Sequence, residues 1–189
     1  MARDLSEILI VDLEATCQSD EDKKNNPNFI NEIIEIGICR FNLKTLEISD
    51  LEGVIVKPQK SVITKFCTEL TTLTQEDVDK GMPYQEAVSY INSKYRPRDK
   101  GWASWGDYDR KQVKRNNDLY NGGKSSLFSE THTNLKHQFS ILNGYTKEFG
   151  VEKALSILNL KFEGTQHRGI DDVKNIARIW KAVLLKQRS

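Results

Sequence analysis

Two acidic residues near the N-terminus, Asp12 and Glu14, end the apolar run from Ile8 to Val11. Consecutive β-branched aliphatic residues are typical of a buried strand, and side chains at positions i and i+2 of a strand point to the same face. Neighbouring carboxylates there repel each other and resist desolvation, so they are costly without a partner. Carboxylate oxygens suit Mg²⁺, Mn²⁺ and Ca²⁺. The pair is therefore either a divalent-cation site or the hydrated end of a strand that runs into solvent.

A further acidic position follows a short strand that we expect over residues 101–106. Asp107 comes directly after Gly106, but it could equally be the N-cap of a helix predicted over residues 108–119. Asp109 has the same charge and would serve as well on that ground. Only its place at the strand end favours Asp107 as a ligand.

A histidine and an aspartate lie near the start of the last predicted helix, which covers residues 170–184. His167 and Asp172 are five positions apart, so on one ideal helix they would diverge by roughly 140°. They can converge if His167 lies on the preceding loop and Asp172 on the first turns, and Gly164 and Gly169 give that loop its freedom. The alternative for His167 is a structural hydrogen bond.

The remaining elements supply the scaffold for these side chains. Two extended segments, 33–41 and 46–56, are joined by a tight connection, which predicts a hairpin beside the first strand. Residues 18–28 are polar and are expected to form an exposed loop, and residues 66–71 a mixed loop. A capping box at Thr74 and Asp77 opens a short helix. Apolar periodicity predicts the other helices, at 84–95, 108–119, 134–149, 151–158 and 170–184.

Composition places the chain among ordinary globular proteins. With 189 residues and 38% hydrophobic side chains, it is expected to form a single domain over 1–189 with its core at about 8–185. The net charge of +1 predicts no partner. Basic side chains gather over 94–115 and 173–189, which suits binding of a polyanion but is also common for solubility alone.

Cysteine usage and hydropathy indicate the cellular compartment that we expect for the protein. The three cysteines, Cys17, Cys39 and Cys67, match neither a disulfide framework nor a zinc spacing. The chain shows no signal-peptide core and no apolar run of membrane-spanning length, so we expect a cytoplasmic protein.

Taken together, the ordered acids and histidine resemble the DEDDh 3′→5′ exonucleases. The flanking residues are most similar to the branch that degrades small interfering RNA and trims histone-mRNA and ribosomal-RNA 3′ ends. The resemblance covers nearly the whole chain, from about Ile8 to Leu185, and it is carried by Val11–Cys17, Asn31–Gly37, Phe66–Thr71, Ser104–Asp109, His167–Asp172 and Asn175–Arg178.

This resemblance implies an RNase H-like α/β fold, with a mixed, mostly five-stranded sheet flanked by helices. It also implies two Mg²⁺ or Mn²⁺ ions as cofactors. Asp12 would bridge them, Glu14 and Asp172 would bind one, and Asp107 would assist the other, partly through water. His167 would be the general base that takes a proton from the attacking water.

Substrate contacts follow from the same resemblance. The backbone at Ala15 and Thr16 would meet the sugar of the terminal nucleotide. Phe66, Leu70 and Trp105 would stack on the base, because single-stranded ends bind largely through aromatic or apolar surfaces. For each of these three side chains, packing in the core is an equally good explanation.

The implied function is a two-metal 3′→5′ exonuclease acting on single-stranded 3′ ends, with RNA favoured, and releasing nucleoside 5′-monophosphates. One alternative is a catalytically idle nucleic-acid-binding or regulatory module on the same fold. Another is the same chemistry on DNA or on very short oligonucleotides. The chain departs from the branch at Thr72, where the branch usually has glycine, and this is expected to alter the local loop.

Overall fold

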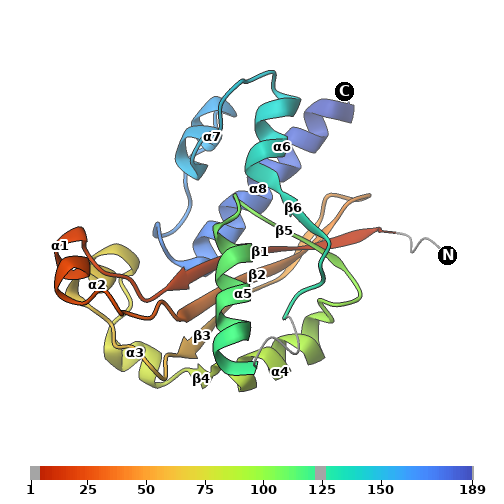
Figure 1. Cartoon of the computed structure of the whole chain (residues 1–189). Coiled ribbons are helices and arrows are strands. Elements are labelled where there is room, and N and C mark those ends of the chain that lie inside the picture. Colours follow the sequence, from red (N-terminus) through yellow and green to blue (C-terminus); the bar gives the residue numbers. More distant parts are fainter. Residues whose placement is uncertain (1–4, 122–126, 189) are drawn as a thin grey trace.

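Strand β1 (Glu7–Ala15) lies inside a mixed sheet, as its apolar run predicts (Figure 1). Within residues 5–121 and 127–188, which the computed structural model describes, six strands form this sheet in the order β4-β3-β2-β1-β5-β6. The other five strands are β2 (Ile33–Asn42), β3 (Ile48–Lys57), β4 (Met82–Pro83), β5 (Gly101–Ser104) and β6 (His132–Asn134).

Pairing within the sheet agrees with the sequence-based expectation. Strands β1 and β2 are antiparallel, as are β2 and β3, which confirms the predicted hairpin. Strand β5 is parallel to β1, and β6 is parallel to β5. The predicted α/β class is confirmed. Five strands were expected from the resemblance, and the described residues form six. Neither β6 nor the two-residue edge strand β4, which pairs with the end of β3, was located in the sequence.

Both faces of β1 are buried, so alternate side chains enter two different cores. Leu9 and Val11 pack against α4 (Tyr84–Tyr95) and α5 (Tyr108–Asn121). Ile10, on the opposite face, packs with α6 (Leu135–Leu142), α7 (Val151–Ile157) and α8 (Gly169–Arg188). Each aliphatic side chain buried in this way contributes about 1.5–3 kcal/mol, which explains why the strand is apolar from Ile8 to Val11.

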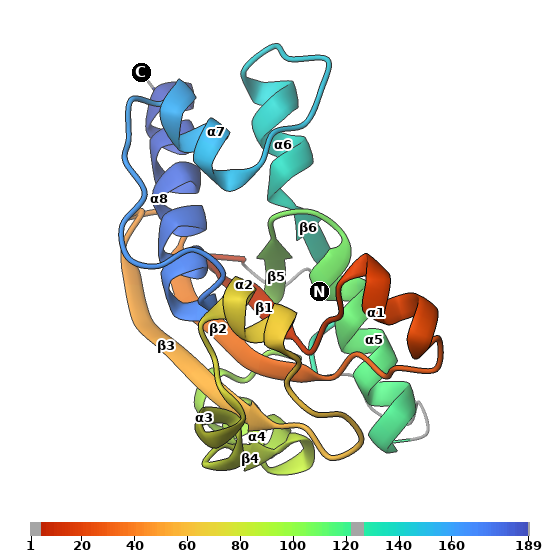
Figure 2. The same ribbon diagram turned by 90° about the vertical axis from the view of Figure 1, so that its left-hand side faces the viewer.

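Two short helices lie near the carboxyl end of β1 (Figure 2). Helix α1 (Asp20–Asn25) begins after Ser19 and buries none of its residues, so the predicted exposed loop contains one helical segment. The predicted mixed loop at 66–71 is instead helix α2 (Lys65–Thr71), whose N-cap is Thr64. Both were missed because such short helices are set by caps and lack an apolar stripe.

Two other helix predictions concern where a helix begins or ends. The capping box is confirmed at α3 (Gln75–Asp79), where the Thr74 side chain accepts from Asp77 N and the Asp77 side chain accepts from Thr74 N. The predicted helix over 134–149 is too long, since α6 ends at Leu142. Gly144 then adopts a φ of 73°, a left-handed conformation that terminates helices. None of the helices in the described ranges is both long enough and apolar enough to cross a bilayer.

Candidate active site

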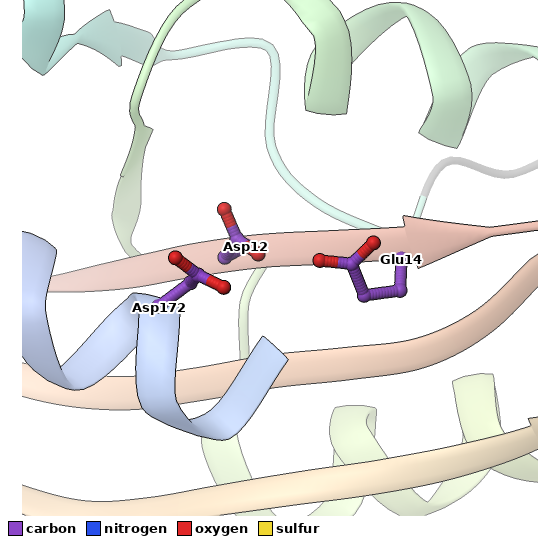
Figure 3. A group of neighbouring side chains, drawn as sticks. All are labelled: Asp12, Glu14 and Asp172. Atoms are coloured by element: carbon purple, nitrogen blue, oxygen red, sulfur yellow. The ribbon is translucent and has the colours of Figure 1, made fainter. Parts of the chain in front are cut away.

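Three carboxylates converge at the end of β1 (Figure 3). Asp12 and Glu14 extend from the same strand, as their spacing predicts, and Asp172 comes from the first turns of α8. One carboxylate oxygen from each residue lies within 4.8 Å of those of the other two. Glu14 is only 9% exposed, and Asp12 is partly buried. This spacing lets the three side chains bind one divalent cation together.

The electrostatics of the cluster favour the binding of a cation. Burial raises the pKa of Asp12 well above its usual range, and the neighbouring carboxylates Asp109 and Glu14 raise it further. Burial, followed by the charge of Asp172, raises the pKa of Glu14 to about 8. Burial also raises the pKa of Asp172 to about 6. A cation at this point would offset both effects, because it replaces lost hydration and screens the mutual repulsion.

The donor set also fits a cation. In the part of the chain that the structure describes, none of the three carboxylates is paired with a lysine or arginine. Asp172 Oδ2 is buried and has no hydrogen-bond partner there. A buried, unpaired carboxylate oxygen is costly, and hard divalent cations prefer such oxygen ligands.

A pocket of about 560 Å³ opens above the carboxylates. Its floor is formed by the acids, and its walls combine apolar and polar side chains from several elements. Besides the three carboxylates, the lining includes Leu13, Ala15, Cys17, Leu70, Trp105, Tyr108, Asp109, Gly150, Val151, Glu152, Lys153, Phe162, Gln166 and His167. A cavity of this size can accommodate a nucleotide-sized ligand.

The structure separates the two aspartates that follow β5. Asp109 is 4% exposed, lines the pocket and accepts a hydrogen bond from Leu13 N at 3.0 Å. Burial raises its pKa to about 6 despite that bond. The Asp107 side chain is 46% exposed, pairs with Arg110 at 3.2 Å and does not line the pocket. The choice of Asp107 over Asp109 therefore disagrees with the geometry.

Helical phase explains this correction. Asp109 is the second residue of α5 and has a fixed place on the helix, whereas Asp107 is the residue before the helix begins. Asp109 shares its side of the helix with Gln112, Val113 and Asn116, all of which are buried. Asp109, Gln112 and Asn116 are polar, so apolar periodicity in the sequence does not mark this buried side of α5.

His167 lies where its spacing predicted. It lines the pocket from the loop before α8, while Asp172 enters from the helix itself. The His167 backbone has a φ of 57°, in the left-handed region that few non-glycine residues adopt. The imidazole is exposed at the pocket, where it can reach a bound water or phosphate.

Three of the predicted substrate-binding residues line the pocket: Ala15, Leu70 and Trp105. Leu70 is 37% exposed, so part of its side chain is available for contact. Trp105 also has a structural role, because its indole N–H donates to the Phe149 carbonyl at 2.9 Å. Tyr108, which was not among the predicted substrate-binding residues, lines the pocket and is 50% exposed.

Two predicted substrate-binding residues lie outside this pocket lining. Phe66 is 38% exposed on α2 but does not line the cavity. Thr16 is fully buried, and its backbone N–H donates to the Glu32 carbonyl at 2.8 Å. The Thr16 amide is therefore already satisfied, and the geometry does not support the expected sugar contact through this group.

The departure at Thr72 falls at the C-cap of α2, beside the pocket wall that Leu70 provides. Thr72 has a φ of 64°, in the left-handed region. Glycine adopts this conformation without penalty, whereas a β-branched residue is strained there. The backbone thus retains the turn that glycine favours, and the expected change of the loop is not seen in this backbone angle.

The mixed sheet, with acids at the end of its central strand and a histidine in the same pocket, defines an RNase H-like α/β protein whose carboxylate cluster fits a divalent cation. A family model described as "Exonuclease" matches residues 9–180, and the chain belongs to this family. The predicted resemblance to the DEDDh 3′→5′ exonucleases is confirmed by this match together with the relatives and solved structures described next.

Curated relatives agree with this placement. The chain is 29% identical over 182 residues to "3′-5′ exoribonuclease 1" of Homo sapiens, covering 91% of this chain and 50% of the relative. It is 31% identical over 183 residues to "ERI1 exoribonuclease 3" of Bos taurus, covering 93% and 52%. The chain therefore spans about half the length of these relatives.

Solved structures show the same fold. The nuclease domain of 3′hExo, described as a DEDDh family member bound to rAMP, has a TM-score of 0.83 and 28% identity, with 98% of this chain and 94% of that chain covered. A 3′-exonuclease in a structure of histone mRNA stem-loop recognition has a TM-score of 0.80 and 25% identity, with 97% and 65% covered.

Proposed function

We propose that this chain is a 3′→5′ exonuclease that hydrolyses phosphodiester bonds at single-stranded RNA 3′ ends and releases nucleoside 5′-monophosphates. The observation that carries the proposal is the unpaired carboxylate cluster of Asp12, Glu14 and Asp172 beneath an open pocket that also contains His167. The preference for RNA is supported by the relatives, which are named exoribonucleases, and by the similar nuclease domain bound to rAMP.

Four carboxylates would hold two divalent cations, Mg²⁺ or Mn²⁺. Asp12, Glu14 and Asp172 have the shared spacing that one cation needs. For the fourth carboxylate we propose Asp109 in place of Asp107, because Asp109 is buried against the same pocket. When bound, such a pair lowers the pKa of the attacking water and neutralises charge on the phosphodiester oxygens.

His167 would act as the general base. Histidine is suited to this role because its ordinary pKa lies close to neutral pH. The side chain lines the pocket from the loop opposite β1, on the way from solvent to the carboxylates. One positioned base contributes about 10²–10⁴-fold to a rate, so loss of His167 is expected to cripple turnover while leaving cation binding intact.

The terminal nucleotide would bind against the pocket wall. Tyr108, Trp105 and Leu70 present aromatic and apolar surfaces, and Ala15 lies beside the acids, where the sugar would sit. Unstacked bases bind well to such surfaces because every base has a π-face. Phe66, on the neighbouring α2, would contact only a substrate that extends beyond this pocket.

The test is degradation of RNA and DNA oligonucleotides labelled at the 3′ or the 5′ end, with Mg²⁺, Mn²⁺ or EDTA. We expect cation-dependent shortening from the 3′ end, faster on RNA, lost in Asp12→Ala and slowed by about 10²–10⁴-fold in His167→Ala. Binding of RNA without shortening under any cation would overturn the proposal in favour of an idle binding module. Turnover limited to DNA or to dinucleotides would overturn the substrate assignment.

A further inference from the structure

A buried acid outside the carboxylate cluster holds the start of α8. Glu35 lies in the middle of the apolar strand β2 and is only 1% exposed. Its Oε2 accepts hydrogen bonds from Arg168 Nε at 3.0 Å and from Gly169 N at 3.1 Å. The first N–H groups of a helix have no partner within the helix, and a negative charge is favourable there. Glu35 therefore caps α8 from a neighbouring strand.

The backbone brings β2 and α8 close enough for this contact. A Cβ atom at Gly37 would lie 1.9 Å from the Gly169 carbonyl oxygen, so the first turn of α8 rests directly on the β2 backbone. Glu35 is also the register partner of Glu14 across β1 and β2. The cap of α8 is thus built into the strand next to the carboxylates, directly opposite the proposed ligand Glu14.

A second carboxylate holds the other side of the histidine loop, which we define as residues 164–168. Asp171 Oδ2 accepts a hydrogen bond from Thr165 N at 2.8 Å. The Asp171 carboxyl group fills the space beside Gly164, where a Cβ atom would lie 2.2 Å from it. His167 therefore lies between two anchors, Asp171 on one side and Glu35 on the other, and keeps a left-handed backbone between them.

We propose that Glu35 is a positioning residue for hydrolysis, which rests on the proposed exonuclease function. By holding Arg168 and Gly169, Glu35 sets the histidine loop and the first turn of α8 relative to β1. It thereby places the His167 imidazole against the carboxylate cluster. Its own side chain does not line the pocket and does not touch the substrate.

The substitution Glu35→Gln tests this role with little change of shape. An amide oxygen in the place of Oε2 can still accept both N–H groups, but the negative charge that pairs with Arg168 and favours the start of α8 is lost. The amide NH₂ group would face Ile170 N, which now lies 3.5 Å from Oε1, and it cannot accept that N–H. Groups that orient catalytic side chains typically contribute about 10–100-fold, and we expect kcat on labelled RNA to fall by that factor. KM is expected to stay within about twofold, because the base-binding wall comes from α2, α5 and the β5–α5 turn.

A matched control is provided by a second buried acid near the start of β2. Glu32 is fully buried and, like Glu35, accepts backbone hydrogen bonds, from Gln59 N and Lys60 N at 2.8 Å. It has no bond to the histidine loop among those found in the described residues. Glu32→Gln should lower the melting temperature while leaving kcat near the wild-type value. An equal loss of kcat in both variants would overturn the positioning role.

Two further readouts separate this proposal from the exonuclease assignment. In a His167→Ala background, Glu35→Gln should lower kcat by less than about threefold, because the residue that it positions is already absent. Amide hydrogen exchange needs no turnover: residues 165–170 should exchange faster in Glu35→Gln and at the wild-type rate in Glu32→Gln. Unchanged exchange in Glu35→Gln would contradict the positioning role of Glu35 even if RNA hydrolysis is confirmed. Faster exchange in a chain without nuclease activity would contradict only the proposed function.

Discussion

The two ends of β1 both carry acidic side chains, but the molecule treats them in opposite ways. At the first end, Glu7 accepts hydrogen bonds from Lys100 and Arg40. Burial acts to raise its pKa, but these two cationic donors outweigh burial and hold the pKa below the usual value. At the far end, burial and neighbouring acids raise the pKa of Glu14 to about 8.

This difference separates an acid with a structural role from acids that form a binding site. Glu7 fastens the start of β1 to the neighbouring segments, and its charge is matched within the chain. Asp12 and Glu14 destabilise the cation-free fold, because their charges repel and lose hydration. Groups with strongly perturbed pKa values that gather in a pocket are characteristic of functional sites, so the matching charge is expected from a ligand.

The largest expected effect comes from removing the central acid of the unpaired end. Asp12→Asn should abolish high-affinity cation binding and lower kcat by about 10³-fold or more, since bound cations contribute several kcal/mol of transition-state stabilisation. Single-turnover hydrolysis of a 5′-labelled RNA measures this effect. Hydrolysis within tenfold of the wild-type rate would show that the carboxylates at this end are not the reactive centre.

The next effect distinguishes the two aspartates after β5. Asp109→Asn should lower kcat by about 10²–10³-fold, as expected for a buried group that stabilises charge at the reactive centre. Asp107→Asn should leave kcat within about twofold, because its side chain is exposed and paired with Arg110. The same hydrolysis assay applies to both variants. The reverse order of effects would return the ligand role to Asp107.

An intermediate effect concerns stability and pH. The pKa of Glu14 is raised from 4.5 to about 8 by burial and repulsion, so over this range the folded state binds more protons than the unfolded state. Its contribution to stability is therefore present at low pH and is lost as pH rises through about 8. In EDTA, the melting temperature of the wild type should fall relative to that of Glu14→Gln as pH rises from 5 to about 8.

Adding a divalent cation provides the control for this pH dependence. Mn²⁺ or Mg²⁺ should remove most of the wild-type decline, because cation binding takes the place of protons on the carboxylates. Parallel melting curves for the wild type and Glu14→Gln at every pH, measured by circular dichroism in EDTA, would count against a raised pKa at this end of β1.

The smallest effect is expected at the paired end. Glu7→Gln should lower the free energy of unfolding by at most about 1 kcal/mol, since partly exposed ion pairs contribute little. It should leave kcat and KM unchanged, because the site lies at the other end of the strand. Urea denaturation gives the first quantity and the RNA assay gives the second. A clear loss of kcat would remove the contrast between the two ends.

Elements with strong apolar periodicity could be predicted from the sequence. The apolar runs of β1 and β2 and the stripe of α8 each bury a continuous face, so their residue types follow from packing. Helices α1 and α2 could not be found in this way, because they are short and depend on Ser19 and Thr64 as caps. Their stability comes from local hydrogen bonds, which periodicity does not detect.

The site was predictable as far as it depends on spacing within one element. Asp12 and Glu14 share a face because a strand alternates, and His167 with Asp172 converge because one precedes the helix. The choice between Asp107 and Asp109 could not be made in this way, because it depends on which of them faces the pocket at the start of α5. The availability of the Thr16 amide could not be predicted either, because it depends on a hydrogen bond to the Glu32 carbonyl. Glu35 was hidden inside an apolar strand, since its donors lie more than 130 positions further along the chain.

The most direct test of the account is Mn²⁺ binding by electron paramagnetic resonance, in the presence and absence of a nucleoside 5′-monophosphate at pH 7.5. We predict that the wild type and Glu7→Gln bind Mn²⁺ with the same affinity, that the nucleotide strengthens binding, and that Asp12→Asn loses it. Absence of Mn²⁺ binding to the wild type, or equal binding to Asp12→Asn, would contradict the claim that the unpaired acids of β1 form a cation site.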